Sequence, residues 1–341
     1  MTIDKFLEEF KNIKNEIKLP LIRIIETSDF SRIKCRFEYL LKIITSNQKD
    51  WLKKKISDFL KSGENQTKEN FSGLLGEMMA LGEIILAFDE FKLEMKKSGS
   101  DFNLNNNNAN ISIEVNTPQK TRSPKKTTAH NHGVTRHVSS KGEIKMELKT
   151  VAPCGYPTKP DYNIAYEAVQ KFSQIKQEKP KQFSGKNISI LWLDLNDPID
   201  FGGFNMAEQC RPILAFRGSI TSGAIWNAFY SKKGDRIYNS YTGAYDLGSE
   251  ICPMEFNGRF YRQDNKIDFV IINAFTEKFI FQNPCSDKKF SNSLYRSFLR
   301  LYNVNLSSSF ICLYDKNKLS EIIDIARSQN NGFYMALKYD I

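Results

Sequence analysis

The sequence lacks paired cysteines, long hydrophobic runs and glycine-rich phosphate loops. Its six cysteines are scattered without a Cys-x-x-Cys pair, which argues against a disulfide framework or a zinc site and favours reduced thiols. The longest apolar stretch, Leu74–Leu86, is shorter than a membrane span and contains Glu77 and Glu83. We therefore expect no membrane partner.

Several enzyme motifs are also missing. The sequence contains no P-loop, no Gly-x-Ser-x-Gly elbow and no dinucleotide-binding fingerprint, so the corresponding classes of small-molecule enzyme have no supporting motif. The first eighteen residues form a charged helical pattern without the apolar centre of a signal peptide. We therefore expect a cytoplasmic protein.

Positive charge exceeds negative charge along the 341 residues. The chain has 49 Lys and Arg residues against 39 Asp and Glu residues, which gives a net charge of +10. Hydrophobic residues make up 40% of the chain, enough to bury a sizeable core in one large domain or two ordinary ones. The excess charge favours an anionic partner, and nucleic acid is the first candidate.

Helical and strand patterns alternate in the first third of the chain. Apolar residues recur every three or four positions within 1–70, which predicts a helical scaffold or dimer surface. The segment 71–88 is apolar on nearly all sides, as expected of a buried helix. Strand signals follow at 91–95, 101–104 and 111–115, and an asparagine-rich turn separates the last two. These two strands form a β-hairpin in outline.

The rest of the chain continues this alternation. A long polar segment, 117–142, precedes a predicted helix after Pro160 and the apolar run ISILWLDL, which we expect to be a central strand. Further strands are predicted at 269–274, 278–282 and 310–314, and a helix at 318–327. The order of elements predicts an α/β core with a mixed sheet.

Three acidic residues follow an order that suggests a metal site. Glu77 lies within the buried helix, Asp101 begins the first hairpin strand, and Glu114 lies on the second. Glu114 and Asn116 are two apart on a strand, so they share a face. The hairpin is expected to bring Asp101 and Glu114 close enough to share a cation, with Glu77 approaching from the helix. Mg²⁺ is commonly held by one or two carboxylates with substrate phosphate and water, and it activates water for hydrolysis.

These residues resemble the signature of the PD-(D/E)xK nuclease superfamily. The matching stretches, within about 71–195, are Gly76-Glu77, Ser100-Asp101 and Ile113-Glu114-Val115-Asn116. The resemblance implies a restriction-endonuclease-like core, in which helices flank a mixed central β-sheet, preceded here by the helical region. It also implies a DNA endonuclease dependent on Mg²⁺ (or Mn²⁺), in a role such as restriction or phage defence. Its metal ligands would be Asp101, Glu114 and Glu77.

The sequence departs from this signature at Asn116, where the family has a lysine that orients the attacking water and stabilises the transition state. Some similar family members use a lysine from the following helix instead, and Lys171 is the candidate here. Alternatives stay open for each helical residue. Lys171 is also compatible with a solvent-exposed position. Glu77 is also compatible with a simple salt bridge, and in that case Glu83 is the alternative residue for the role of Glu77 at the metal site.

The polar segment 117–142 has basic residues and no acidic residue. We predict a loop that binds phosphates beside the hairpin; a disordered, solvated loop is the alternative. Its six basic residues, which account for six of the ten net positive charges, are Lys120, Arg122, Lys125, Lys126, Arg136 and Lys141. The three histidines of the chain also lie here, and we interpret them as incidental rather than as a zinc site: His130, His132 and His137.

Two functions are compatible with the sequence. The first is a metal-dependent DNA endonuclease, with RNA as an alternative substrate. The second, motivated by Asn116, is a catalytically inactive nuclease-like protein that binds nucleic acid or a partner protein. We divide the chain into a helical region (1–70), a nuclease-like core (71–199) and an α+β extension (200–341). The extension is expected to complete the core, recognise DNA or form a homodimer, which would suit the two-fold symmetry of a duplex.

Overall fold

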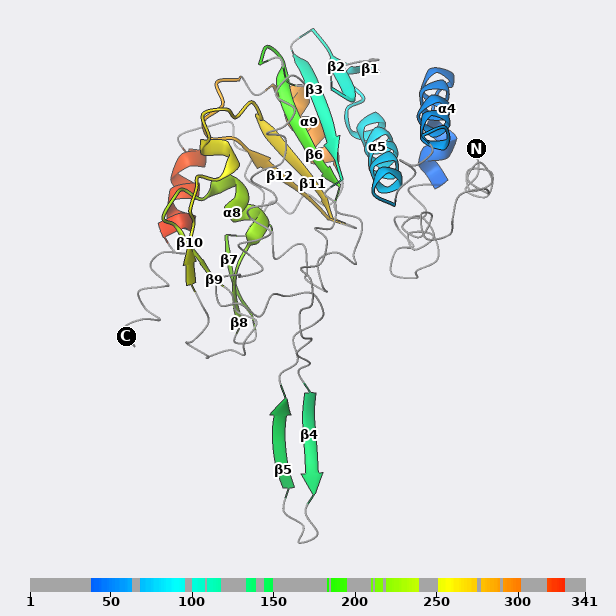
Figure 1. Ribbon diagram of the computed structural model, residues 1–341. Helices are drawn as coiled ribbons and strands as arrows, with labels where there is room; N and C mark the ends of the chain where they lie inside the picture. Colours follow the sequence, from blue (N-terminus) through cyan, green and yellow to red (C-terminus); the bar gives the residue numbers. More distant parts are fainter. Residues whose placement is uncertain are drawn as a thin grey trace.

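A mixed six-stranded β-sheet forms the centre of the computed structural model of this chain (Figure 1). The strands lie in the order β1-β2-β3-β6-β11-β12. Their bounds are Lys92–Glu94 (β1), Phe102–Asn105 (β2), Asn110–Asn116 (β3), Ile188–Asp194 (β6), Phe269–Ala274 (β11) and Glu277–Gln282 (β12). β6 pairs in parallel with β3 and β11, whereas the three outer pairings are antiparallel. The predicted α/β class with a mixed sheet is thereby confirmed.

The structure describes part of the chain. The described residues are 38–62, 68–95, 100–107, 109–117, 133–138, 144–149, 183, 185–194, 210, 212–216, 219–238, 251–274, 277–288, 291–301 and 318–328. Several predicted elements therefore lie outside them: the helical pattern of 1–37, the helix after Pro160 and the strand at 310–314. The division into three regions stays a prediction, although β11 and β12, from the region 200–341, belong to the same sheet as the hairpin.

β6 is the central strand that its apolar sequence predicts. All seven of its residues are buried, because β3 and β11 pair with its two edges and helices cover both faces of the sheet. A continuous apolar run without alternation is the pattern expected of a parallel strand in this position. β6 therefore separates two hydrophobic cores, one on each side of the sheet.

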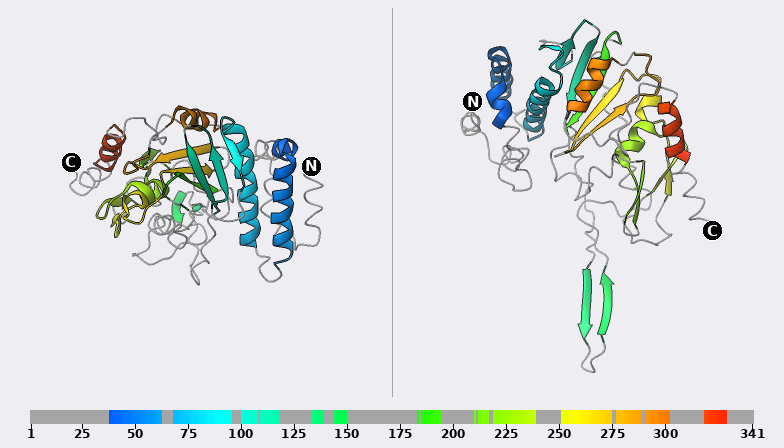
Figure 2. Two further views of the ribbon diagram at one scale, coloured as in Figure 1. Left: turned by 90° about the horizontal axis from the view of Figure 1, so that it is seen from above. Right: turned by 180° about the vertical axis from the view of Figure 1, so that it is seen from behind.

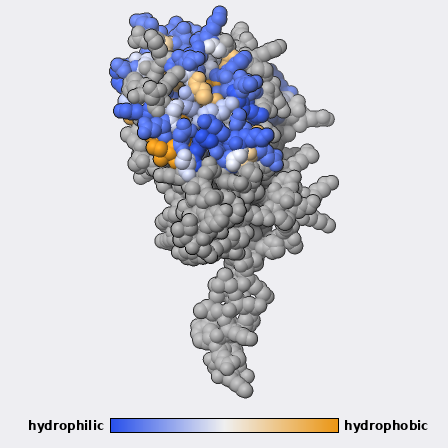
Figure 3. Space-filling view, turned by 90° about the vertical axis from the view of Figure 1, so that its left-hand side faces the viewer, coloured by the Kyte–Doolittle hydropathy of each residue, from blue (hydrophilic) through white to orange (hydrophobic). Residues whose placement is uncertain are grey.

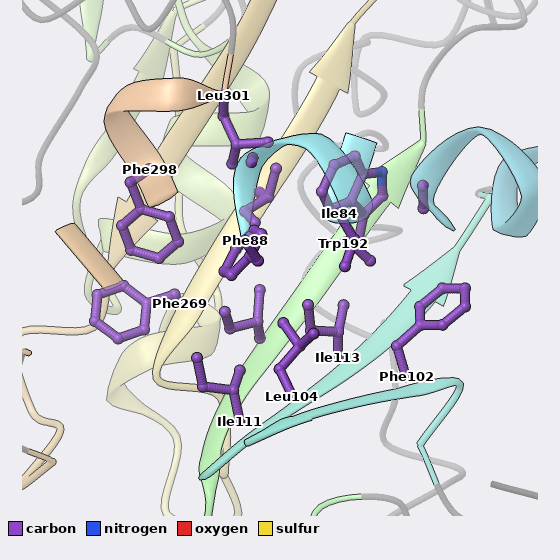
Figure 4. Packing of buried hydrophobic residues seen from close by; sticks show 14 of the residues in the cluster. Ile84, Phe88, Phe102, Leu104, Ile111, Ile113, Trp192, Phe269, Phe298 and Leu301 are labelled. Carbon is purple, nitrogen blue, oxygen red and sulfur yellow. The ribbon is translucent and has the colours of Figure 1, made fainter. Parts of the chain in front are cut away.

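One face of the sheet is covered by α5 (Lys68–Ala87) and α9 (Asn292–Arg300). Ile84 of α5 belongs to the same buried cluster as Ile113 of β3 and Trp192 of β6, and Figure 4 shows this cluster from close by. Phe298 of α9 meets Phe269 of β11 with their ring centroids 5.2 Å apart. Burying a side chain of this size contributes roughly 1.5–3 kcal/mol, so these contacts fix both helices on this face.

The opposite face is covered by α8 (Ala224–Tyr230) and by a helix at 318–328. Trp226 and Phe229 of α8 cluster with Leu191 and Leu193 of β6 and with residues of β11 and β12. Figure 2 shows the helices on the two sides of the sheet from two further directions. The helix at 318–328 is in the place that the sequence predicts.

α4 (Ser46–Leu60) packs against α5 on the side away from the sheet. The rings of Phe59 and Phe71 have their centroids 5.7 Å apart. At the start of α4, the backbone N–H of Thr45 donates to Oε1 of Gln48 at 2.9 Å, half of a capping box. Residues 38–43 are also helical. The described part of the predicted N-terminal helical region is therefore helical.

Further strands lie outside the central sheet. Within the described ranges they form three two-stranded sheets: β4 (Gly133–Val138) with β5 (Ile144–Lys149), β7 (Ile213–Phe216) with β8 (Ser219–Ser222), and β9 (Arg236–Tyr238) with β10 (Ile251–Pro253). The first pair corrects the prediction that 117–142 is a loop throughout. Apolar residues recur at alternate positions in IKMELK, and the two valines of GVTRHV are four residues apart on the same face, a pattern that favours paired strands. Figure 1 shows this pair at a distance from the central sheet.

The surface of the described residues is mainly hydrophilic on the side shown in Figure 3, with smaller hydrophobic areas. The exposed large hydrophobic side chains among the described residues are Tyr39, Leu86, Leu299, Ile322 and Ile325. The helices of the described ranges include none with the length and apolar character to cross a membrane.

Gly76 allows α5 to approach the ends of β3 and β6. A Cβ atom at this position would lie 2.1 Å from Oγ1 of Thr117 and 3.0 Å from Oδ2 of Asp194, whereas one at Gly73 would meet nothing within 4 Å. We expect Gly76→Ala to lower the free energy of unfolding by about 1–3 kcal/mol through overpacking. The matched variant Gly73→Ala should raise it by up to about 1 kcal/mol, since alanine favours helix. Urea denaturation measures both; equal effects would contradict the close approach.

Glu90, just after α5, is held by two arginines of α9. Nε of Arg296 donates to Oε1 of Glu90 at 2.7 Å and Nη2 of Arg296 donates to Oε2 at 2.5 Å. Nη2 of Arg300 lies 3.2 Å from Oε1 of Glu90, and Arg300 also pairs with Asp89. The hydrogen bond from Arg296 is the main reason that the pKa of Glu90 is lowered from 4.5 to about 2.

This lowered pKa makes the ion pair sensitive to acid. Because the folded pKa of Glu90 lies below its ordinary value, the stability it contributes is present above about pH 4.5 and is lost as the pH falls towards 2. We expect Arg296→Ala to return the pKa of Glu90 towards 4.5, measured by NMR titration of its carboxyl carbon. The control Arg262→Ala, which removes an arginine near Phe256, should leave this pKa low. An unchanged pKa in Arg296→Ala would contradict the assignment.

Candidate functional site

Asp101 and Glu114 lie opposite each other on the hairpin of β2 and β3. The two strands pair antiparallel, and the register runs from Asn105 opposite Asn110 to Phe102 opposite Ile113. Continued by one residue, this register sets Asp101 across from Glu114. Directly opposed residues of antiparallel strands have Cβ atoms about 4.5–5.5 Å apart. The hairpin therefore brings these two acidic residues side by side.

Glu114 is buried on the face of the sheet that α5 does not cover. Its neighbours Ile113 and Val115 pack in the cluster with α5, so strand alternation turns Glu114 to the other face. Its register partner on β6 is Leu191, which belongs to the core beneath α8. Only 3% of Glu114 is exposed. Glutamate is almost never so fully buried unless it is paired.

Asp101 is partly exposed and is held in place by the backbone of the neighbouring strand. Its Oδ2 accepts a hydrogen bond from the N–H of Val115 at 2.9 Å. This bond lies just before the start of β2, where β3 continues beyond its register with β2, so the carboxylate accepts from a strand N–H that has no register partner in β2. One oxygen of Asp101 is thus used for orientation, and a carboxylate can accept through its other oxygen as well.

The donor chemistry of this pair fits a hard divalent cation. Mg²⁺ binds oxygen ligands and commonly takes one or two carboxylates, with water and substrate phosphate in its remaining positions. Across the part of the chain that the structure describes, no cluster of three or more His, Cys, Asp or Glu residues is suitable for a metal ion. Asp101 and Glu114 would therefore hold an ion as a pair of carboxylates rather than as part of a larger protein cage.

The two glutamates of α5 have other partners. Oε2 of Glu77 lies 2.5 Å from Nζ of Lys55 in α4, and α5 covers the face of β3 opposite to that of Glu114. Glu83 is 5% exposed, and its Oε1 lies 3.2 Å from Nζ of Lys278 in β12. Glu77 forms the salt bridge that the sequence left open as an alternative, and its role as a metal ligand stays a prediction.

Buried polar side chains, which the sequence reasoning missed, lie beside the pair on the same face. Oδ1 of Asn103 accepts hydrogen bonds from Oγ of Ser100 and from Oγ of Ser112, each at 3.1 Å. Nδ2 of Asn187 donates to Oγ of Ser112 at 3.1 Å. The face is thus polar along β2 and β3 and mainly apolar along β6, β11 and β12. The signal in the sequence was the alternation in FNLN and NISIEVN, whose inner polar positions fall on one face.

A second buried polar row, also missed, crosses the α5 face at the carboxyl ends of β6 and β11. Nδ2 of Asn273 donates to Oδ1 of its register partner Asp194 at 2.9 Å. Asn273 is also the register partner of Lys278, which pairs with Glu83 of α5. The row therefore joins three strands to the helix. The sequence marks this row by charged residues in apolar strands: Asp194 ends β6, and Lys278 interrupts β12.

The remaining predicted residues are less completely described. Asn116 ends β3, two residues from Glu114 and on the same face, and it is half-buried. Arg136 and His137 belong to β4, where their register partners are Met146 and Lys145. The other predicted residues lie outside the described ones: Lys171, Lys120, Arg122, Lys125, Lys126, Lys141, His130 and His132.

Comparison of the chain with protein-family models, with curated proteins and with solved structures found no match. The resemblance to PD-(D/E)xK nucleases is therefore carried by its motif residues alone. Inference about function starts from Asp101, Glu114 and the polar side chains around them.

Proposed function

We propose that the chain is a Mg²⁺-dependent (or Mn²⁺-dependent) DNA endonuclease with a PD-(D/E)xK-type site. The observation that carries this proposal is the register of β2 and β3, which, continued by one residue, sets Asp101 opposite a buried Glu114. Two adjacent carboxylates repel each other, and a cation between them removes that repulsion. A mixed sheet covered by helices on both faces is compatible with the restriction-endonuclease-like core of the proposal.

Each residue has a defined task in this proposal. Asp101 and Glu114 bind the ion, and the N–H of Val115 fixes the orientation of Asp101. When bound, the ion polarises a phosphoryl oxygen and lowers the pKa of a coordinated water. Asn116 has no charge to stabilise the transition state, so Lys171 stays the proposed source of a lysine.

The partner in this proposal is DNA, with RNA as the alternative substrate. The basic segment 117–142 follows β3 directly and would neutralise phosphates near the carboxylate pair. It includes β4, which pairs with β5 into a two-stranded ribbon, and a ribbon of two strands is narrow enough to enter the major groove. A cytoplasmic role in restriction or phage defence, with a homodimer cutting both strands, belongs to the same proposal.

Plasmid cleavage tests this proposal. The purified full chain, incubated with supercoiled plasmid, should produce nicked or linear DNA in the presence of Mg²⁺ or Mn²⁺ and none in the presence of EDTA, since the carboxylates alone cannot activate water sufficiently. Single-stranded RNA, tested in parallel, identifies the preferred substrate. Intact plasmid and intact RNA with either metal would count against catalysis.

A second candidate is a nuclease-like protein that binds nucleic acid without cleaving it. Two observations favour it: Asn116 replaces the lysine of the signature, and Asp101 already has a structural task as the acceptor for Val115. In this case the chain would bind duplex DNA with an affinity that falls steeply with salt, and Mg²⁺ would change neither the affinity nor the DNA. Fluorescence anisotropy across a salt series, with and without Mg²⁺, separates the two candidates.

A further inference from the structure

Asn103 of β2 carries a buried amide nitrogen without a hydrogen-bond partner. Its side-chain oxygen accepts hydrogen bonds from two hydroxyl groups, whereas Nδ2 has no hydrogen-bond acceptor among the residues that the structure describes. Only 4% of the residue is exposed. Such donors are rare in native proteins, because a buried N–H that loses water without gaining a partner destabilises the fold. A buried donor without an acceptor in this position therefore indicates that a bound molecule supplies one.

The side-chain oxygen of Asn103 belongs to a hydrogen-bond network. Ser100 and Ser112 both donate to Oδ1 of Asn103, and Asn187 donates to Ser112. In this arrangement both hydroxyl groups use their protons on Oδ1, and Nδ2 is the end of the amide that stays available. Four polar side chains, including Asn103 itself, make up this network.

This donor lies next to the carboxylate pair. Asn103 of β2 is two residues after Asp101, and its register partner Ser112 is two residues before Glu114 on β3. Phe102 and Leu104 belong to the cluster on the α5 face, so Asn103 points to the same face as Glu114. The amide nitrogen and the two carboxylates thus belong to one polar area of the sheet.

We propose that Asn103 donates to a phosphate oxygen of the nucleic acid strand bound at Asp101 and Glu114. This inference rests on the proposed function and adds a substrate-binding residue to it. Asparagine side chains are regular donors to phosphate oxygens, and a phosphate that shares the cation with the carboxylates would supply the acceptor that Nδ2 lacks. A neutral donor here also provides hydrogen bonding on a face where Asn116 replaces a lysine.

Two variants with the side-chain size of asparagine test the inference. Asn103→Leu removes the donor, and the rate of single-turnover plasmid cleavage with Mg²⁺ should fall by about 10- to 100-fold, the value of a hydrogen bond to a charged group. Its affinity for Mn²⁺, measured by EPR without DNA, should stay that of the wild type. Asn103→Asp should also cleave slowly but bind Mn²⁺ more tightly, because a third carboxylate joins the pair. The control Asn105→Leu, at the far end of β2, should match the wild type.

The measured cleavage rates and Mn²⁺ affinities decide whether Asn103 has this role. Wild-type cleavage in Asn103→Leu, or wild-type Mn²⁺ affinity in Asn103→Asp, would overturn it, and thermal unfolding identifies a variant that has not folded. If Asn103→Leu does not fold, the Mn²⁺ affinity of Asn103→Asp decides alone. A wild type that neither binds Mn²⁺ nor cleaves would remove the proposed function and this inference together. An active wild type with equally active variants would remove this inference only.

Discussion

Glu114→Gln is expected to reduce Mg²⁺-dependent plasmid cleavage by at least about 100-fold, or roughly 2.7 kcal/mol of transition-state stabilisation. The side chain keeps its size and can still hydrogen-bond, but it loses the charge that holds the cation opposite Asp101. Asp101→Asn should have an effect of similar size for the same reason. Single-turnover cleavage at saturating protein measures the loss without a contribution from weaker DNA binding.

Matched controls distinguish the loss of the metal site from a general loss of negative charge. Glu321 is exposed on the helix at 318–328 and Asp58 is exposed on α4, so Glu321→Gln and Asp58→Asn remove the same charges away from the hairpin. Both should cleave like the wild type. Equal cleavage by the wild type, Glu114→Gln and Asp101→Asn would reject these two residues as the site.

Lys278→Met is expected to lower the free energy of unfolding by about 3–5 kcal/mol. Nζ of Lys278 lies 3.2 Å from Oε1 of Glu83, and the side chains are 0% and 6% exposed. Removal of the lysine leaves Glu83 charged between α5 and the sheet, near the buried Asp194 at the end of the same polar row. Urea denaturation at neutral pH measures the effect.

The double variant Glu83→Leu with Lys278→Met tests the cause of this loss. If the loss comes from the stranded charge, the double variant should recover most of the stability, because apolar replacement of a whole buried ion pair is often neutral or stabilising. The control Lys53→Met removes an exposed lysine of α4 and should change the stability by less than about 0.5 kcal/mol. A Lys278→Met variant as stable as this control would contradict the buried pair.

The sequence predicted elements whose pattern is local. The apolar run of β6, the alternation in β1 and β3 and the buried helix α5 were each read from a single segment, and the structure confirms them. The pairing of β2 with β3 was also accessible, because the turn between them is short and rich in asparagine. The strand β4 was missed because basic and polar residues dominate the segment around it, which weakens its alternating apolar pattern.

The partners of charged residues could not be read from the sequence. Glu77 and Glu83 both interrupt the same apolar helix, and nothing local indicates that one faces Lys55 of α4 and the other Lys278 of β12. Those partners lie in elements that are adjacent only after folding. The same applies to Asn103, whose contacts depend on the register of β2 and β3 and on Asn187 just before β6.

A cation shared by Asp101 and Glu114 is central to the proposed function. A crystal structure of the full chain with Mn²⁺, with data collected at the manganese absorption edge, tests this directly. We predict an anomalous peak within coordination distance of both carboxylates, and no such peak in crystals of Glu114→Gln. A wild-type map without a peak at the hairpin, or with manganese bound only elsewhere, would contradict the proposed site.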